Sequence, residues 1–242
     1  METSKRKHEC LDVLGEGAFG VVLRAMYGGQ DAVVKIPRLG AVHAHYFRHE
    51  AQVLHHLDGA GGTPRLLHLG PPEDPKIVMT YSGSTTFQDL LDDEVLDGQG
   101  VVQVFHSAAL KLQEVHAKGV VHNDLKEDNV MVDAKPTYNG CYEASLIDFG
   151  LSKFVEGVQL RKFKLQDLYG AEVDDEGGDP ANDVMGLGNM LEEVLNDMDW
   201  PWGEEALRRD LASLAAVMTS ECGSERTHLD QVILRLQVLL SH

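Results

Sequence analysis

A glycine-rich run near the start of the chain, Gly15-Glu16-Gly17-Ala18-Phe19-Gly20, restricts the possible folds more than any other feature. Glycine adopts backbone conformations closed to other residues and lets a phosphate approach the main chain closely. In a dinucleotide-binding fold, a G-x-G-x-x-G run ends a strand and opens a helix. Here the β-branched pair Val21-Val22 follows, and a Gly28-Gly29 turn comes soon after. This order predicts strand, turn and strand, and it argues against the dinucleotide fold.

The first third of the chain is predicted to be strands around one helix. Apolar residues recur at helical spacing over Val42–Leu57, which predicts a helix there. Short apolar runs bounded by Gly and Pro predict strands at Leu11–Leu14, Val21–Met26, Ala32–Ile36, Leu66–Leu69 and Ile77–Thr80.

Beyond Tyr81 the pattern becomes mainly helical. A strand-and-loop segment is expected at Gly119–Val132 and a short strand at Leu146–Phe149. Helical periodicity predicts helices at Phe87–Leu91, Val101–His116, Val184–Asn196, Glu204–Met218 and Leu229–Leu240. The fold class is therefore α+β, with a strand-rich portion followed by a helix-rich one.

Charge and cysteine content exclude several classes of protein. The formal net charge is −18, which leaves no basic footprint for binding nucleic acid. No stretch approaches the roughly 20 apolar residues of a membrane span, and the first ten residues hold no signal-peptide core. Cys10, Cys141 and Cys222 are far apart and form no metal-binding pair. Reduced thiols predict a cytoplasmic or nuclear protein.

Two charged residues of the strand-rich portion are candidates for an ion pair. Lys35 ends an apolar strand, so its side chain is half buried there and its charge needs a partner. Glu50, on the following helix, is the best candidate. The alternative, in which Lys35 extends to solvent, is equally compatible with the strand alone.

A dense polar loop between apolar strands, His122–Asn129, holds the second group of candidates. Asp124 can accept a proton, Lys126 can hold a phosphate, and the amide oxygen of Asn129 can bind a hard cation. Asp148 follows the apolar run Leu146-Ile147 and suits a carboxylate presented to Mg²⁺. Each of these segments alone could be a surface turn.

Taken in order, these motifs resemble those of the protein kinase superfamily over nearly the whole chain. The resembling residues are the glycines of Gly15–Gly20 with Val22, the pair Lys35 and Glu50, the loop His122–Asn129, and the D-F-G triplet Asp148-Phe149-Gly150. The stretch Asp183–Gly188 resembles the start of the family's central helix, and Arg226 matches the arginine that pairs with its A-P-E glutamate. The resemblance implies one kinase domain over residues 1–242. Its β-rich N-lobe, with one helix, would cover about 1–80, its hinge about 80–84, and its helical C-lobe about 85–242.

The resemblance also implies a role for each matching residue. Asp124, Lys126, Lys35 and Glu50 would be catalytic: Asp124 would accept the substrate hydroxyl's proton, Lys126 would neutralise the γ-phosphate, and Lys35, held by Glu50, would grip the α- and β-phosphates. Asn129 and Asp148 would bind Mg²⁺. His122, Phe149 and Leu54 would belong to an internal hydrophobic spine. The ATP-contacting residues would be Leu14, Gly15, Glu16, Gly17, Ala18, Phe19, Gly20, Val22, Val33, Lys35, Met79, Thr80, Tyr81 and Ser82.

The chain departs from the family pattern at several positions. Asn123 replaces the arginine that collects an activation-loop phosphate, and only Ser152 and Tyr169 carry hydroxyls between Leu151 and Gly170. We therefore expect activity that does not depend on activation-loop phosphorylation. The A-P-E motif is missing, and Glu172 is the nearest candidate partner for Arg226.

The expected function is ATP-dependent phosphoryl transfer to Ser or Thr hydroxyls of proteins, since a lysine two places after the catalytic aspartate is the serine/threonine-kinase pattern. The alternatives are a pseudokinase scaffold and a small-molecule phosphotransferase of similar fold. Residues 165–207 contain thirteen Asp and Glu and no Lys or Arg. This acidic segment favours substrates with basic residues near the target hydroxyl. An acidic surface without a docking role is an equal alternative.

Overall fold

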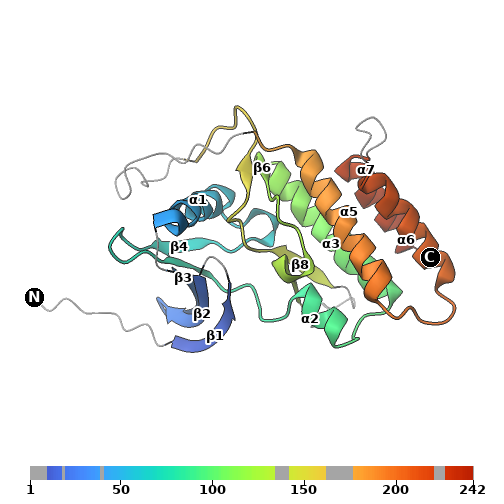
Figure 1. The fold of residues 1–242 in the computed structure, drawn as a ribbon, viewed down its shortest axis with the longest axis horizontal. Coiled ribbons are helices and arrows are strands. Elements are labelled where there is room, and N and C mark those ends of the chain that lie inside the picture. Colours follow the sequence, from blue (N-terminus) through green and yellow to red (C-terminus); the bar gives the residue numbers. More distant parts are fainter. Residues whose placement is uncertain are drawn as a thin grey trace, which may run out of the picture. The chain divides into compact units, whose positions relative to one another are not determined.

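The first part of the fold is a five-stranded antiparallel sheet in the order β1-β2-β3-β5-β4 (Figure 1). The computed structural model describes residues 10–17, 20–38, 41–133, 142–161, 177–220 and 227–241. The strands are β1 (Cys10–Glu16), β2 (Gly20–Tyr27), β3 (Gln30–Pro37), β4 (Leu66–Leu69) and β5 (Ile77–Thr80). All five were predicted from the sequence.

The register of the sheet gathers particular side chains on one face. A two-residue turn joins β2 and β3, and both of its residues, Gly28 and Gly29, have positive φ, as this type of hairpin turn requires. Across the resulting pair, Val22 lies opposite Lys35. Opposing residues in antiparallel strands share a face, so Val22 and Lys35 point to the same side of the sheet.

Helix α1 (Ala41–Leu57) packs on β3 and β4. Its buried residues include Phe47, Ala51, Leu54 and Leu57, which recur every three or four positions and form one apolar stripe. Glu50 lies on the same helix, beside this stripe.

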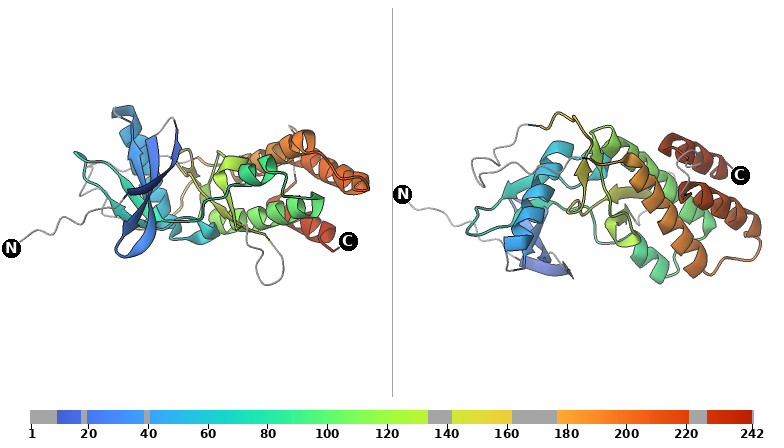
Figure 2. Two further views of the ribbon diagram at one scale, coloured as in Figure 1. Left: turned by 90° about the horizontal axis from the view of Figure 1, so that it is seen from below. Right: turned by 45° about the horizontal axis from the view of Figure 1, so that its top comes forward.

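The second part of the fold is helical (Figure 2). Helix α3 (Gly98–His116) is lined with buried apolar residues and contacts α7 (Leu229–Leu239), while α5 (Pro180–Asp197) packs on α6 (Glu205–Met218). Asp179 caps the start of α5 by accepting a hydrogen bond from the Ala181 amide. The remaining elements are α2 (Phe87–Asp92) and two small antiparallel pairs, β6 (Val120–Val121) with β9 (Lys153–Phe154) and β7 (Val130–Asp133) with β8 (Glu143–Leu146).

One sequence prediction about this part is wrong. A strand was predicted over Leu146–Phe149, but β8 ends at Leu146. Leu146 pairs with Val130, the first residue of β7, so no strand residue remains opposite the next positions. Asp148 has φ 61°, a left-handed conformation outside the strand region.

The chain divides into two compact units. The first unit contains residues 1–58, 64–81 and 160–174, and the second contains 59–63, 82–159 and 175–242. No helix in the described part of the chain is long and apolar enough to span a membrane.

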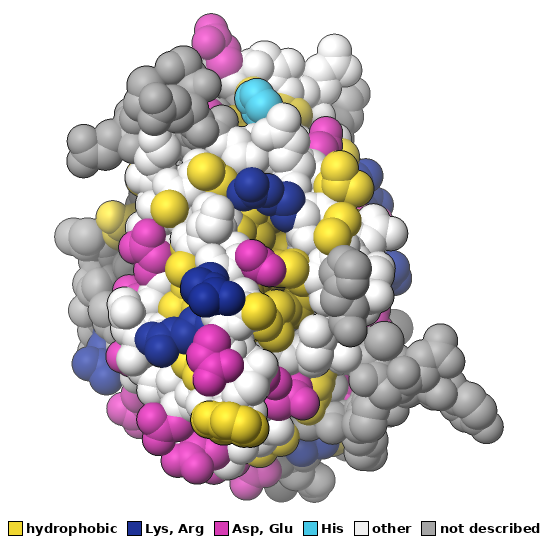
Figure 3. Space-filling model, turned by 90° about the vertical axis from the view of Figure 1, so that its right-hand side faces the viewer, with side chains coloured by type: hydrophobic (Ala, Val, Ile, Leu, Met, Phe, Trp, Pro, Cys, Tyr) yellow, Lys and Arg dark blue, Asp and Glu magenta, His cyan; other side chains and the backbone are white. Residues whose placement is uncertain are grey.

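The helical end of the second unit carries charges of both signs. On this face, Lys and Arg side chains lie among hydrophobic ones in the middle, and acidic side chains gather toward the lower edge of the view (Figure 3). Exposed acidic residues of α5 and α6 include Glu193, Asp197 and Glu205. On this face, the acidic side chains are therefore densest near one edge.

Candidate active site

In the first unit, Lys35 and Glu50 form a buried ion pair. The Lys35 Nζ lies 3.0 Å from Oε1 and 2.8 Å from Oε2 of Glu50. The two residues are only 6% and 3% exposed. Of the two alternatives that the sequence left open for Lys35, the structure shows the pair. Buried opposite charges fix each other's position strongly, because separating them would leave a charge without a partner.

The three glycines of the glycine-rich run have different surroundings. Gly17 and Gly20 exchange backbone hydrogen bonds, with N···O distances of 2.9 and 3.3 Å, which close the connection between β1 and β2. A Cβ at Gly20 would collide with the carbonyl oxygen of Ile36 on β3, whereas a Cβ at Gly15 or Gly17 would meet nothing within 4 Å. Packing therefore requires glycine at position 20 alone. Ala18 and Phe19 lie outside the described residues.

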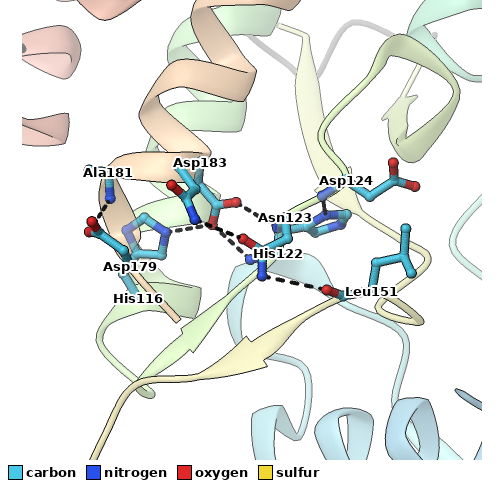
Figure 4. Close-up of polar contacts among 9 residues, drawn as sticks. His116, His122, Asn123, Asp124, Leu151, Asp179, Ala181 and Asp183 are labelled. Carbon is cyan, nitrogen blue, oxygen red and sulfur yellow. Dashed lines mark hydrogen bonds and ion pairs between the residues drawn. The ribbon is translucent and has the colours of Figure 1, made fainter. Parts of the chain in front are cut away.

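In the second unit, the buried carboxylate of Asp183 organises the polar loop (Figure 4). Asp183 is 1% exposed and lies in the first turn of α5. It accepts hydrogen bonds from the backbone amides of His122 and Asn123, both at 2.7 Å, and contacts His116 Nε2 at 2.8 Å. The start of the loop is thus hydrogen-bonded to Asp183 of α5, and Asp183 in turn contacts His116 of α3.

The His122 ring links this loop to the D-F-G triplet. Its Nδ1 accepts from the Asp124 amide at 3.3 Å, and its Nε2 faces the Ile147 carbonyl at 2.9 Å. Because a carbonyl only accepts, this pairing requires the tautomer with its proton on Nε2. The ring also packs against Phe149, with centroids 4.6 Å apart, and both side chains are fully buried.

The structure brings Asp124, Lys126 and Asn129 of the polar loop together. The Asn129 Nδ2 donates to the backbone oxygen of Asp124 at 2.7 Å and to its Oδ2 at 3.0 Å. The Lys126 Nζ lies 3.6 Å from the same Oδ2. The Ile147 amide donates to the Asn129 backbone oxygen at 3.0 Å. Asp148 is the next residue along the chain, so its backbone lies close to this cluster.

Asn123 suits its position in the loop. Its φ is 62°, in the left-handed region where asparagine is enriched. Its side chain donates to the Leu151 carbonyl at 3.5 Å and accepts from Asn182 at 3.4 Å. The side chain therefore joins the loop to the segment after the D-F-G triplet and to α5.

Most of the remaining predicted site residues lie in the strands of the first unit or directly after them. Val33 lies opposite Met79 in the sheet. Thr80 Oγ1 accepts from the Arg65 amide at 2.9 Å, and the Arg24 guanidinium stacks over the Tyr81 ring at 4.6 Å. Leu14, Glu16 and Val22 are at least partly exposed, as is Ser82, which begins the second unit. Tyr169, Glu172 and Arg226 lie outside the described residues.

The sequence did not indicate a role for three residues that hold the polar loop, directly or through a neighbour, or that contact a predicted ATP-contacting residue. Asp183 was matched to a family motif without a role, and His116 and Arg24 were not selected at all. Arg24 and His116 carried no local signal of a functional role, because their contacts with Tyr81 and Asp183 span more than fifty positions of the sequence. Asp183 had one usable signal, an acidic residue immediately before the predicted helix Val184–Asn196.

Glu127, in the 3₁₀ turn Glu127–Asn129 of the polar loop, is a buried carboxyl that the motifs did not indicate. It is 7% exposed. Burial raises its pKa, and the neighbouring charges of Glu193, Asp128 and Asp197 raise it further. Three acidic side chains, one from the loop and two from α5, are therefore close enough to act on Glu127.

Comparison with known proteins identifies the family. The model of the protein kinase domain matches residues 8–236. The chain belongs to the protein kinase domain family. Its two-part fold, strands followed by helices, agrees with that assignment, and the fold class expected from the sequence is confirmed.

Several curated kinases are similar at low identity. Mitogen-activated protein kinase p38b of Drosophila melanogaster is 27% identical over 62% of this chain and 43% of its own length. Serine/threonine-protein kinase CTR1 of Arabidopsis thaliana is 29% identical over 78% of this chain and 24% of its own length. Dual specificity protein kinase shkD of Dictyostelium discoideum is 30% identical over 76% of this chain and 25% of its own length. The chain thus spans less than half the length of these relatives.

Proposed function

We propose that the chain is an ATP-dependent protein kinase that transfers the γ-phosphate to Ser or Thr hydroxyls of protein substrates. The observation that carries this proposal is the cluster of Asp124, Lys126 and Asn129, tied by backbone hydrogen bonds to the strand end that presents Asp148. Phosphoryl transfer needs positioned charge more than covalent chemistry, and this cluster supplies a carboxylate, an ammonium and an amide at one place.

Each group has a chemically suitable task. The Asp124 carboxylate would take the proton of the attacking hydroxyl, oriented by the Asn129 amide that donates to it. Lys126, half exposed beside Asp124, would neutralise charge on the transferred phosphoryl group. In the first unit, Glu50 holds the Lys35 ammonium at a defined place, where it would contact the α- and β-phosphates.

The residues present fit Mg²⁺. The Asn129 Nδ2 is used in hydrogen bonds to Asp124, which leaves its Oδ1 available as an acceptor. Asp148, the residue after Ile147, whose amide bonds the Asn129 backbone oxygen, would add a carboxylate. One or two such oxygens together with nucleotide phosphates are the usual ligands of Mg²⁺ in kinase sites. Bound there, Mg²⁺ would neutralise phosphate oxygens. Within the described ranges, no group of three or more His, Cys, Asp or Glu could hold a metal.

The glycine-rich run supports a nucleotide ligand. Neither Gly15 nor Gly17 is required by packing, and neither has positive φ. Both would allow phosphates to approach the backbone closely. Gly20, in contrast, is explained by its contact with β3.

We further propose that activity does not depend on phosphorylation of the activation loop. Ser152 has 0% exposure, and its hydroxyl donates to the Phe149 carbonyl at 2.7 Å. It is therefore poorly placed to accept a phosphate. Because Ser152→Ala would also remove this buried hydrogen bond, that substitution cannot by itself test the proposal. Treatment of the purified protein with a broad-specificity phosphatase should leave its activity unchanged, and a large loss would contradict the proposal.

Substrates with basic residues near the target hydroxyl are part of the proposal. Glu127, Asp128, Glu193 and Asp197 produce a negative field around the turn that follows Lys126. Part of the acidic segment has a structural role, since Asp183 is buried and Asp179 caps α5. Peptides with and without an Arg near the Ser should differ in kcat/KM at low salt, and the difference should shrink as salt rises. Equal rates at low salt would contradict this preference.

A single assay separates the proposal from its alternatives. Purified protein is incubated with γ-labelled ATP and either a Ser/Thr peptide library or a panel of small alcohols. Label in peptides supports a protein kinase. Label in small alcohols alone indicates a small-molecule phosphotransferase, and no label in either favours a scaffold.

A further inference from the structure

Arg161, thirteen positions after Asp148 in the sequence, makes three contacts with the end of helix α1. Its guanidinium Nη1 lies 2.6 Å from the Asp58 carboxylate and 3.4 Å from the His55 carbonyl oxygen. Its backbone amide donates to His56 Nδ1 at 3.0 Å. All four residues belong to the first unit, whereas the chain up to Gln159 belongs to the second.

The end of α1 is suited to receive a cation. The helix ends at Leu57, and the carbonyls at the C-terminal end of a helix carry partial negative charge. Asp58 follows with φ 49°, and its amide donates to the Leu54 carbonyl at 3.0 Å. The hydrogen bond from Arg161 lowers the pKa of Asp58, and the charges of Arg161, Arg65 and His55 lower it further.

We propose that Arg161 is a positioning residue that fastens the segment after the D-F-G triplet onto the end of helix α1 without phosphorylation. This inference rests on the proposed kinase function. Glu50, which holds Lys35, lies on the same helix, about two turns before the contact. Anchoring the helix end to this segment therefore links the Lys35–Glu50 pair to the chain that leaves Asp148.

The proposal accounts for the replacement at Asn123. In the family pattern, an arginine at that place collects a phosphate carried by the activation segment. In this chain the segment itself supplies the cation, Arg161, and helix α1 with Asp58 supplies the acceptors. The contact is complete with unmodified side chains.

The test is Arg161→Ala, measured against phosphatase-treated wild type. We expect kcat to fall by about 3- to 20-fold. The midpoint of thermal unfolding should stay nearly constant, because exposed ion pairs contribute little to stability. The Arg161→Ala change keeps a backbone amide at position 161, and hydrogen exchange of that amide and of residues 55–58 should accelerate. Arg209→Ala is the matched control, since Arg209 is exposed on α6 and has no ion pair with any described residue.

Exchanging the charges of Arg161 and Asp58 provides a second test of the proposal. Arg161→Asp should lower kcat at least as much as Arg161→Ala, and adding Asp58→Arg should restore much of the loss. Unchanged kcat and unchanged exchange in Arg161→Ala would overturn the proposal. So would a loss in Arg161→Asp that Asp58→Arg does not relieve.

Failure of this inference can be told apart from failure of the proposed function. If wild-type protein transfers no phosphate, the kinase proposal fails, while the hydrogen-exchange comparison still tests the anchor. If wild type is active and Arg161→Ala equals it in rate and exchange, only the anchor is rejected.

Discussion

At the scale of single residues, the glycine-rich run separates glycines required by the fold from glycines available to a ligand. Gly20 faces the backbone of Ile36 so closely that no side chain fits. Gly15 and Gly17 face open space. Within one sequence motif, Gly20 is thus required for packing, whereas Gly15 and Gly17 leave room for a ligand. Substitution of single glycines can distinguish these two roles.

Gly20→Ala should destabilise the protein by roughly 1–3 kcal/mol, because the added methyl group must displace strand β3. Gly17→Ala should leave the free energy of unfolding nearly unchanged and raise the KM for ATP. Urea unfolding and steady-state kinetics of both variants check this. Equal destabilisation by the two changes would contradict the account.

Glu127 provides a pH-dependent prediction at the same scale. Burial raises its folded-state pKa above the unfolded value of 4.5. The folded state therefore binds more protons than the unfolded state between these two pKa values, and stability falls as pH rises through this window. Glu127→Gln cannot ionise, so it should be more stable than wild type at about pH 7 and nearly equal to it below about pH 4.

Thermal unfolding of wild type and Glu127→Gln across this pH range provides the measurement. Glu73→Gln is the control, because Glu73 is an exposed carboxyl in the loop between β4 and β5. A stability difference that is the same at every pH would show that the charge of Glu127 is not the cause.

At the scale of elements, the Lys35–Glu50 pair joins strand β3 to helix α1. Lys35→Met leaves a buried carboxylate without its cation, and we expect a loss of about 3–5 kcal/mol together with the loss of phosphoryl transfer. Replacing both residues, as Lys35→Met with Glu50→Leu, should recover most of the stability and none of the activity.

Urea unfolding and transfer rates of the single and double variants test this separation. If the double variant stayed as unstable as Lys35→Met, the destabilisation would not come from the unpaired charge. If it regained activity, Lys35 would have no catalytic role.

Helices and strands with a regular pattern of apolar residues were predictable from the sequence. Contacts between residues that are distant in the sequence were not. The strands β2 and β3 coincide with short apolar runs, and the spacing of Phe47, Ala51 and Leu54 on α1 reflects which of its side chains are buried. The strand predicted beyond Leu146 failed because apolar composition cannot show that the partner strand begins opposite that residue.

The residues of the candidate site were predictable from the sequence, whereas the distant residues that hold them in place were not. Asp124, Lys126 and Asn129 lie within one short loop, so sequence proximity already implied their convergence. The hydrogen bonds of Asp183 to the same loop span about sixty positions, and those of Arg161 to the end of α1 span more than a hundred. No local pattern indicates such contacts.

At the scale of the whole molecule, the proposed function makes ATP a stabilising ligand. A ligand that binds only the folded state at 100 times its Kd adds about 2.7 kcal/mol to the free energy of unfolding. Mg·ATP should therefore raise the midpoint of thermal unfolding of wild type and of Asp124→Asn, since Asp124 acts on the acceptor hydroxyl. The gain should be much smaller for the double variant that lacks Lys35 and Glu50.

The central claim, that Asp124 is the base of a phosphoryl transfer, is tested most directly by comparing wild type with Asp124→Asn. The measurement is the rate of label transfer from γ-labelled ATP to Ser/Thr peptides, with the ATP-induced shift in thermal midpoint recorded alongside. The account predicts transfer by wild type and a rate about 10²- to 10⁴-fold lower in Asp124→Asn, with the ATP-induced shift retained. No transfer by wild type, or equal rates in the two proteins, would contradict it.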